Sequence, residues 1–450
     1  MKLCSHSVAT IDLRNNPIST FSPDALNGLE DVLDTLELNN CGLTELPTAV
    51  GKLHRLRTLE LKHNPQLTSL PADLMATVGV TLENLDISNT GITTWPTDSL
   101  KSTVRLRSLR ASGIQLAHIP DDAFLPFAAT LYTLDLSYNK LRAFPAAINQ
   151  LRLLRTLDLS FNVLGTIPEG QFTNCRHSLT TLHLVHVFFR EIPFGLKDLP
   201  SLRYLYLSYN PINAAESDVF IGSISNSLEV LHLDHTLLST VPAAVNGLHA
   251  LRELNFTWNR LQVLEPYAFS SLGQLETLYL DKNPITQIKY ASFGGLDKLK
   301  KLYVRNTSLA YVPNAALGQI PQLLSADFSN NQIEALYDYG FPGMSHLQEV
   351  TLSGNPLSSI SAKALDDLTS THVLNLERCK LAEVPRAVQR MHTLWTLRLE
   401  GNPIECSCPA LGWIEDWRAN HGLIAKVEGH CTNSTKLIQD FMDNDASSCP

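Results

Sequence analysis

The sequence predicts an α/β solenoid, in which short parallel strands stack side by side into one long sheet. Two observations predict this fold class. An apolar frame, L-x-x-L-x-L-x-x-N-x-L, recurs along the chain at spacings of 23 to 26 residues, and the residues in the middle of each copy alternate between apolar and polar. One repeating unit therefore uses most of the 450 residues, and the several ordinary domains that this length suggests are not expected.

Each copy of the frame predicts one strand with one solvated side. In residues 131–141, Leu134 and Leu136 are expected to point inward and Asp135 to point outward. Neighbouring strands lie about 4.7 to 4.9 Å apart, so the stack would offer a surface roughly 75 to 80 Å long, far longer than a small-molecule pocket. The seventeen copies start at Val8, Leu33, Leu56, Leu82, Leu106, Leu131, Leu154, Leu179, Leu202, Leu228, Leu251, Leu275, Leu299, Leu323, Leu347, Thr371 and Leu394.

The ninth position of the frame is usually asparagine. We expect these side chains to turn inward, where an amide can satisfy backbone groups that the strand exit would otherwise leave buried and unpaired. The asparagines are Asn16, Asn64, Asn139, Asn162, Asn210, Asn259, Asn283, Asn331, Asn355 and Asn402. The departures are Cys41, Thr90, Ile114, Val187, Thr236, Thr307 and Cys379. Because Ile114 and Val187 have no polar side-chain group, irregular turns are expected at both.

The frame and its period resemble the leucine-rich repeat, over about nine tenths of the chain. The residues after the last copy, from Asn402 through Cys406, Cys408, Trp413 and Trp417, resemble the cysteine-rich C-terminal cap of extracellular members such as Toll-like receptors and Slit proteins. The resemblance implies a horseshoe with a parallel β-sheet on its concave face, built from 17 repeats plus a disulfide-bonded cap. It gives a solenoid over residues 1–404 without an N-terminal cap, and a cap over residues 405–450.

The resemblance also implies two bridges in the cap, Cys406 with Cys431 and Cys408 with Cys449. The sequence alone leaves all three pairings of four cysteines open. A zinc site is the alternative, which the C-x-C spacing disfavours. A short helix carrying Trp413, Ile414 and Trp417 is expected to cover the last strand.

The front of the chain resembles the inside of a repeat, so a missing upstream segment is expected. The other cysteines, Cys4, Cys41, Cys175 and Cys379, are expected to be buried free thiols.

Catalysis, cofactors and metal are not expected. The sequence has no G-x-S-x-G, H-E-x-x-H, P-loop or G-x-G-x-x-G motif, and the repeats leave no span for a catalytic domain. The balance of 35 basic and 44 acidic residues, a net charge of −9, argues against a nucleic-acid partner.

Aromatic and imidazole side chains at outward-facing positions are the candidate ligand-binding residues. The core does not dictate these positions, and exposed rings gathered on one face are typical anchors of a protein interface. The alternative is that each ring packs on its neighbours for stability alone. The residues are Tyr138, Phe161, His183, His186, Tyr204, Tyr206, Tyr209, His232, His235, Trp258, Tyr279 and Tyr303.

Charged groups among these positions allow two further interpretations. His183 and His232 would lie about 9.5 Å apart, which weighs against a shared metal ion and leaves a pH-dependent interface as an alternative. Acidic residues at the fifth position would steer a basic partner, although such residues also mark an ordinary solvated face. They are Asp12, Glu37, Glu60, Asp86, Asp135 and Asp158.

We therefore expect a non-catalytic module that recognises a protein or peptide, as part of a cell-surface receptor or a secreted protein. Sequons at Asn255, Asn306 and Asn433 give weak support to a secretory route, although a glycan on Asn255 would rise from the candidate binding face. Residues 1–7 lack the apolar stretch of a signal peptide, and a membrane anchor after residue 450 is a further expectation. The alternative is a cytoplasmic scaffold or the recognition segment of a larger signalling protein.

Overall fold

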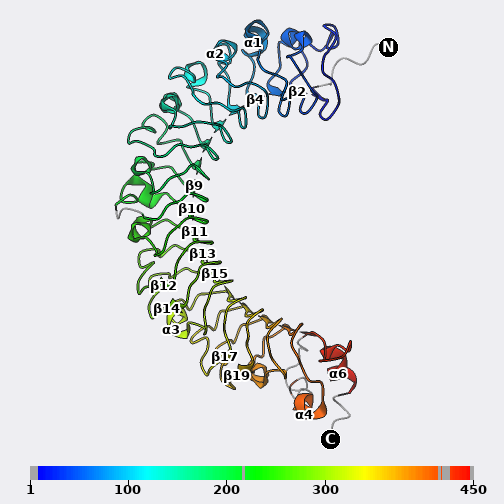
Figure 1. The fold of residues 1–450 in the computed structure, drawn as a ribbon, viewed down its shortest axis with the longest axis vertical. Coiled ribbons are helices and arrows are strands. Elements are labelled where there is room, and N and C mark those ends of the chain that lie inside the picture. Colours follow the sequence, from blue (N-terminus) through cyan, green and yellow to red (C-terminus); the bar gives the residue numbers. More distant parts are fainter. Residues whose placement is uncertain (1–8, 215–217, 414–416, 418–425, 446–450) are drawn as a thin grey trace. The chain divides into compact units, whose positions relative to one another are not determined.

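The computed structural model describes residues 9–214, 218–413, 417 and 426–445 (Figure 1). The chain divides into two compact units. Unit 1 comprises Met1–Ile212 and Asp218–Leu228, and unit 2 comprises Asn213–Ser217 and Glu229–Pro450. The boundary predicted between residues 404 and 405 stays a prediction.

Unit 1 is a stack of three-residue strands, each at positions three to five of the frame. The strands pair in parallel in the order of the chain, and residues at the same frame position face each other, as in Leu134 opposite Leu157. The strands are β1 (Thr10–Asp12), β2 (Thr35–Glu37), β3 (Thr58–Glu60), β4 (Asn84–Asp86), β5 (Ser108–Arg110), β6 (Thr133–Asp135), β7 (Thr156–Asp158), β8 (Thr181–His183) and β9 (Tyr204–Tyr206).

Short helical turns carry the chain of unit 1 back from one strand to the next, on the side of the repeats away from the strands (Figure 1). Several of them follow a proline, such as Pro47 and Pro145, because proline fixes φ and has no N–H that would go unpaired there. They are η1 (Thr48–Lys52), α1 (Ala72–Val78), α2 (Thr97–Leu100), η2 (Leu125–Phe127), η3 (Ala146–Gln150), η4 (Phe194–Leu196) and η5 (Ser223–Asn226).

Unit 2 repeats this plan. Its strands on the sheet side are β10 (Val230–His232), β11 (Glu253–Asn255), β13 (Thr277–Tyr279), β15 (Lys301–Tyr303), β16 (Ser325–Asp327), β18 (Glu349–Thr351), β20 (Val373–Asn375), β21 (Thr396–Arg398) and β22 (Lys426–Glu428). Its return segments hold η6 (Ala243–Gly247), β12 (Val263–Leu264), β14 (Gln287–Ile288), α3 (Asn314–Leu317), β17 (Ala335–Leu336), β19 (Ser359–Ile360), η7 (Arg386–Arg390), α4 (Cys408–Leu411) and α6 (Ile438–Asn444). β12 pairs with β14 and β17 with β19, all in parallel.

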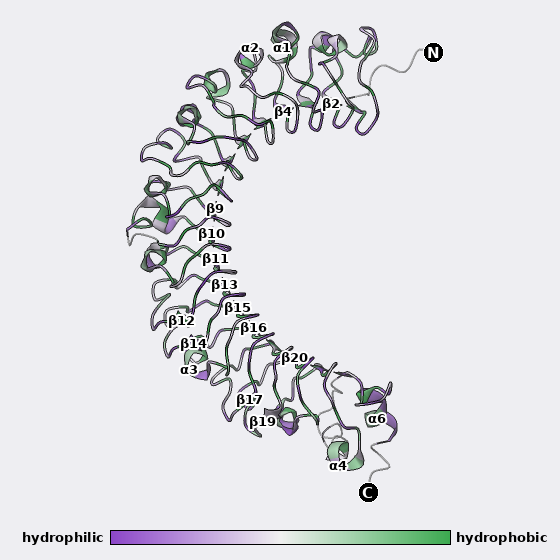
Figure 2. Ribbon diagram, in the orientation of Figure 1, coloured by the Kyte–Doolittle hydropathy of each residue, from purple (hydrophilic) through white to green (hydrophobic). Residues whose placement is uncertain are grey.

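The core of each unit lies between its strands and its return segments. Frame leucines such as Leu134, Leu205 and Leu278 are completely buried, and Figure 2 shows hydrophobic and hydrophilic residues alternating along the repeats. Phenylalanines fill the wider spaces: Phe124, Phe127, Phe189, Phe220, Phe256, Phe269, Phe293, Phe328 and Phe341 are the largest fully buried side chains. The predicted solenoid and its repeat frame are confirmed.

The predicted asparagine ladder is also confirmed, with one exception. The Oδ1 atom of Asn64 accepts the N–H groups of Cys41 and Leu43 at 3.1 and 3.0 Å, and its Nδ2 donates to the carbonyl of Leu38 at 2.9 Å. The prediction is wrong for Asn16, which is exposed and donates only within its own turn. No preceding repeat in the described part of the chain packs over it.

Two cysteines replace asparagine in the ladder by using their thiols. The Sγ atom of Cys41 lies 3.2 Å from the carbonyl oxygen of Leu13, and that of Cys379 lies 3.5 Å from the carbonyl oxygen of Leu352. Burial raises the pKa of the Cys379 thiol to about 11, so each thiol stays protonated and keeps its S–H donor. Cys41, Cys175 and Cys379 are buried and free, as predicted; Cys4 lies outside the described residues.

Val187 makes the irregular turn that the sequence predicts. Because it has no side-chain acceptor, the N–H groups of Leu164 and Gly165 donate to its backbone carbonyl instead, at 3.2 and 3.4 Å. Phe188, which follows it, has a positive φ of 66°.

The cap closes the last repeat with a strand, which the sequence analysis did not predict. β22 pairs with β21, and the N–H of Leu399 donates to the carbonyl of Glu428 at 2.7 Å. A strand can pair the open backbone edge of β21, which tryptophan side chains on a helix cannot do. Trp417 is buried and Trp413 is half-buried, with ring centres 6.1 Å apart; Ile414 lies outside the described residues.

The bridge between Cys406 and Cys431 is present. Cys408 is also disulfide-bonded, but its predicted partner, Cys449, lies outside the described residues. None of the helices in the described ranges is long and apolar enough to cross a bilayer.

Candidate functional site

The sheet face, formed by the outward-facing residues at frame positions three, five, seven and eight, holds the side chains that the core does not fix. The backbone at position eight is left-handed in every repeat, from Asn15 with φ of 61° to Gly401 with φ of 75°. This conformation costs roughly 1 to 2 kcal/mol for most residues and least for glycine and asparagine. Accordingly, Asn15, Asn40, Asn89, Gly113, Asn306, Asn330, Gly354 and Gly401 occupy eight of these positions.

Six successive repeats place a ring at position eight instead. The residues and their φ angles are Tyr138 (54°), Phe161 (57°), His186 (54°), Tyr209 (60°), His235 (54°) and Trp258 (57°). Histidine is enriched in the left-handed region, but Tyr, Phe and Trp are not, so the fold gives no local reason for the other four rings. Side chains that are unfavourable for the local backbone gather at functional sites. Of the six rings, four lie in unit 1 and two in unit 2, and they mark a candidate site in each unit.

In unit 1 the position-eight rings stack on one another. The rings of Tyr138 and Phe161 lie 4.2 Å apart and 8° from parallel, and His186 lies 5.4 Å beyond Phe161. These contacts agree with the alternative interpretation to the extent that neighbouring rings do stabilise each other. Nevertheless Tyr138 remains 58% exposed, so the stack offers apolar surface to a partner.

A second stack lies along position five of unit 1. The rings of His183 and Tyr206 are 4.6 Å apart and 5° from parallel. Tyr204 and Tyr206 on β9 are half-buried, and Tyr209 is 50% exposed. Unit 1 therefore gathers its predicted site residues into two rows of rings, except Tyr204, which lies at position three.

In unit 2 the predicted histidines contact carboxylates. The Nε2 atom of His232 lies 3.0 Å from Oε1 of Glu253, and the Nδ1 atom of His235 lies 3.0 Å from Oδ2 of Asp234. The His235 ring also stacks on Trp258, with centres 5.6 Å apart.

Cations of the chain itself cover the next rings of unit 2. The Nζ atom of Lys282 lies 5.3 Å from the centre of Trp258, and the Arg305 guanidinium lies 5.1 Å from the centre of Tyr303, which stacks on Tyr279 at 4.9 Å. Arg305 also donates to Oδ2 of Asp281, at 2.6 and 3.0 Å. Burial raises the pKa values of both tyrosines.

The acidic residues at position five have a local structural role. The Oδ1 atom of Asp135 accepts the N–H of Ser137 at 2.9 Å, and Oδ1 of Asp158 accepts the N–H of Ser160 at 2.8 Å. Each carboxylate thus satisfies the backbone where its strand ends. Burial raises the pKa of Asp158, against the hydrogen bonds from Ser160, and the nearby charge of Asp135 raises it further.

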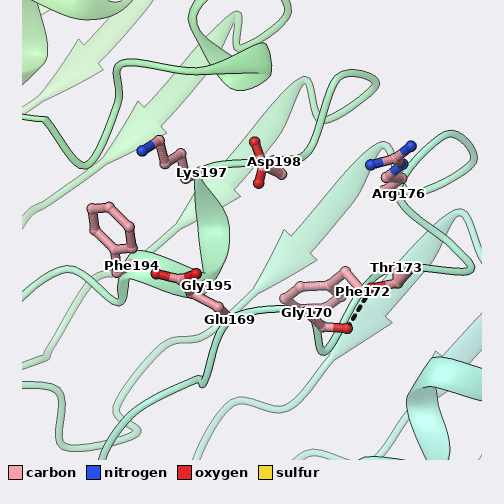
Figure 3. Close-up of a pocket in the computed structure, with 9 residues that line it drawn as sticks. All are labelled: Glu169, Gly170, Phe172, Thr173, Arg176, Phe194, Gly195, Lys197 and Asp198. Carbon is pink, nitrogen blue, oxygen red and sulfur yellow. Dashed lines mark hydrogen bonds between the residues drawn. The ribbon is translucent and has the colours of Figure 1, made fainter.

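Other kinds of site are less well supported. Within the described residues, no three His, Cys, Asp or Glu side chains are placed to hold a metal ion. Figure 3 shows a pocket of about 130 Å³ among the return segments of unit 1, where Lys197 lies 4.6 Å from the centre of the Phe194 ring and Glu169 and Arg176 also line the wall. It is smaller than the several hundred Å³ typical of ligand sites and carries both signs of charge.

The three sequons differ in exposure. Asn433 and the two residues after it are exposed in a turn of the cap. Asn306 is half-buried at a left-handed position eight. Asn255 lies on β11, where its Oδ1 accepts the N–H of Thr257 at 2.8 Å.

Sequence reasoning missed three rings, because it considered only part of the frame. Phe188 lies two residues beyond position eight, is 47% exposed and meets His186 edge-on at 4.9 Å. His372 and Trp395 stack at 4.0 Å at position two, where Trp395 is 56% exposed. A search for rings at positions two and ten of the frame finds all three.

Comparisons with known proteins agree with the repeat frame. A family model described as "Leucine rich repeat" matches residues 105–164, 152–212, 200–261, 226–285, 251–309, 273–333, 321–381 and 346–404, and a second one, also described as "Leucine Rich Repeat", matches residues 7–29. A comparison of the sequence with curated proteins found no significant match.

Several solved structures share the fold at low sequence identity. A Leptospira interrogans LRR protein is 22% identical with a TM-score of 0.69, over 94% of this chain and 96% of that one. TLR13 in the TLR13-ssRNA13 complex is 22% identical with a TM-score of 0.72, over 95% of this chain and 66% of that one. The matching chain of the Toll–Spatzle complex, from Drosophila, is 18% identical with a TM-score of 0.73, over 96% of this chain and 63% of that one. This chain thus spans about two thirds of the TLR13 and Toll chains.

One of these structures bears on the expected partners. Because the TLR13 structure is a complex with ssRNA13, this fold is compatible with a nucleic-acid ligand. The expectation of no nucleic-acid partner, which rests on the net charge alone, is therefore not supported.

Proposed function

Because the chain belongs to the leucine-rich repeat family, whose fold generally serves recognition rather than catalysis, we propose that it is a recognition module that holds a protein or peptide ligand on its sheet face. The observation that carries this proposal is the run of six rings at position eight, on a backbone that favours glycine or asparagine. Exposed Tyr and Trp side chains are the commonest anchors of protein interfaces.

The proposal places the module outside the cell, in a receptor or a secreted protein. The disulfide between Cys406 and Cys431 supports this compartment, because disulfides persist in oxidising surroundings. The Toll–Spatzle complex is a relative in fold that assembles with another molecule. The alternative, a cytoplasmic scaffold, requires the four cap cysteines to be reduced in the cell.

The test replaces rings by the residue that the same position holds elsewhere. Tyr209→Asn and Trp258→Asn introduce at position eight the residue that Asn330 provides at position eight of another repeat, so both variants are expected to fold. A partner selected from an array of secreted and cell-surface proteins should lose affinity by about 30-fold or more, equivalent to about 2 kcal/mol, for each true anchor in surface plasmon resonance.

The matched control is Tyr337→Asn, which removes a ring that is 70% exposed on the return segments. It should leave affinity unchanged. If both sheet-face variants stay folded and bind every partner as tightly as wild type does, the ligand is held elsewhere and the proposal fails. If no protein of the array binds and a single-stranded RNA does, the ligand class is wrong.

A further inference from the structure

In the part of the chain that the structure describes, some rings and carboxylates of the sheet face are covered by cations of the chain itself, and others are not. In unit 2, the guanidinium of Arg305 lies over Tyr303 and binds the Asp281 carboxylate, and the ammonium of Lys282 lies over Trp258. The chain thus supplies its own cations to its rings, and to one carboxylate, in that unit.

In unit 1, Asp12 and Glu37 pair with Arg14 and Arg155 lies over the ring of Tyr132. Asp135, Asp158 and Tyr138 have no such Lys or Arg partner within the described residues. Asp135 and Asp158 face each other across β6 and β7, and both use Oδ1 for the serine two residues later. Within the described part of the chain, neither Oδ2 atom accepts a hydrogen bond, and neither carboxylate pairs with a Lys or Arg side chain. Two carboxylates on adjacent strands repel each other and attract a cation.

The ring stack of unit 1 also has an open end. Phe161 covers one face of Tyr138, while the neighbouring position eight on the other side is Gly113, which has no side chain. The uncovered face of Tyr138 is a flat surface on which a guanidinium can stack.

The sheet face of unit 1 carries more acidic than basic residues, which favours the binding of a guanidinium. Its outward positions carry three basic residues, Arg14, Lys62 and Arg110, of which Arg14 pairs with Asp12 and Glu37. They carry six acidic residues, which are Asp12, Glu37, Glu60, Asp86, Asp135 and Asp158. Arg110 is the cross-strand neighbour of Asp135, is exposed, and forms no ion pair with it within the described residues.

We propose that the sheet face of unit 1 binds an arginine-bearing segment of a protein partner, whose guanidinium groups bind the carboxylates of Asp135 and Asp158 and stack on the open face of Tyr138. The inference rests on the proposed function and names the chemistry of its ligand. Arginine fits better than lysine, because its planar fork serves both a carboxylate and a ring.

The test uses the whole chain and a defined probe, the acetylated and amidated peptide (Gly-Arg)5, titrated by isothermal calorimetry at low and at physiological salt. Wild type should bind this peptide, more tightly at low salt. It should bind the citrulline counterpart, which keeps the shape but loses the charge, at least about 10-fold more weakly.

Variants assign the binding to the named groups. Asp135→Asn with Asp158→Asn should weaken the arginine peptide by at least about 5-fold, and Tyr138→Leu by about 3-fold. The matched control, Asp121→Asn with Asp122→Asn, removes the same charge from exposed residues of a return segment and should change the affinity less than 2-fold, as an order-of-magnitude expectation.

Three outcomes overturn the inference: no binding of the arginine peptide, equal binding of the citrulline peptide, or equal weakening by the control pair. Failure here is distinguishable from failure of the proposed function. One outcome would support the recognition role and contradict the arginine inference. In it, binding of a partner is weakened by substitution of Tyr209 and Trp258 but not by substitution of Asp135, Asp158 and Tyr138.

Discussion

The ring of Tyr138 lies 4.2 Å from that of Phe161 and almost parallel to it, although both residues have left-handed backbones, with φ of 54° and 57°. Stacking of this kind contributes about 0.5 to 1.5 kcal/mol, which is close to the roughly 1 to 2 kcal/mol that the left-handed backbone costs at Tyr138 alone. The two effects nearly cancel. The stack is therefore close to neutral for folding, and its exposed surface is available for recognition.

This near cancellation makes a prediction about stability. Tyr138→Asn loses the stacking and gains a residue suited to the left-handed backbone, so the free energy of unfolding should stay within about 1 kcal/mol of wild type. Leu134→Ala, in the same repeat, creates a cavity at a completely buried site and should cost about 2 to 5 kcal/mol. Urea denaturation measures both, and equal losses would mean that the rings are structural.

Asp158 predicts a stability that depends on pH. Its pKa is raised above the ordinary value of 3.8, first by burial, so the folded state prefers the protonated acid. The stabilisation is fully present below pH 3.8 and is lost as pH rises through the raised pKa. Asp158→Asn should therefore raise the thermal midpoint at pH 7 and leave it unchanged near pH 3.

Asparagine can replace Asp158 without losing the backbone hydrogen bond. Asn255 and Asn375 already accept the N–H two residues later in their own repeats, at 2.8 and 3.0 Å. A lower midpoint for Asp158→Asn at pH 7 would contradict the assignment of burial as the dominant effect.

The buried thiols predict slow alkylation in the native state. Burial raises the pKa of Cys175 to about 12 and that of Cys379 to about 11, so little thiolate exists at pH 8 and little of it is accessible. Labelling of Cys41, Cys175 and Cys379 with N-ethylmaleimide, followed by mass spectrometry, should be at least about 100-fold slower than in urea. Rapid labelling of one of them would show that its repeat opens in the native state.

The cap predicts a specific disulfide map. Non-reducing peptide mapping of protein made through a secretory host should show the bridge of Cys406 with Cys431, and we predict Cys408 with Cys449 as the second. Removing the first bridge with Cys406→Ser and Cys431→Ser should cost about 2 to 4 kcal/mol, read as a lower unfolding midpoint of unit 2. Free thiols at Cys406 and Cys408 in such protein would favour the cytoplasmic alternative.

The sequence was sufficient to locate the strand of each repeat on the sheet side, because the period of the frame fixes which residues face the core. It did not predict the short strands β12, β14, β17 and β19 of the return segments. Leu134 and Leu157 face each other in neighbouring strands as the frame requires. The inward asparagines were predictable for the same reason, since a buried strand exit needs an amide to pair its backbone.

What the sequence analysis missed depends on backbone conformation and on neighbouring repeats. The left-handed backbone at position eight has a sequence signal, the asparagines and glycines of eight repeats, but its meaning for Tyr138 and Trp258 requires the φ angles. β22 could not be found from the frame, because residues 426–428 are not part of a repeat. Lys282, which covers Trp258, comes from the following repeat, and Arg305, which covers Tyr303, comes from the same repeat. Only the geometry shows that, among the described residues, these rings are covered by a cation whereas Tyr138 is not.

The asparagine ladder has a consequence for cooperativity. The amide of Asn64 joins its own turn to the turn of the preceding repeat, so neighbouring repeats in a unit melt together wherever such an amide is present. At Val187 a backbone carbonyl takes over this coupling through longer hydrogen bonds. Ile114 likewise has no side-chain group that could join its repeat to the preceding one. A linear array with weak joints unfolds in segments, so heating or pulling should separate unit 1 into blocks that meet near residues 114 and 187.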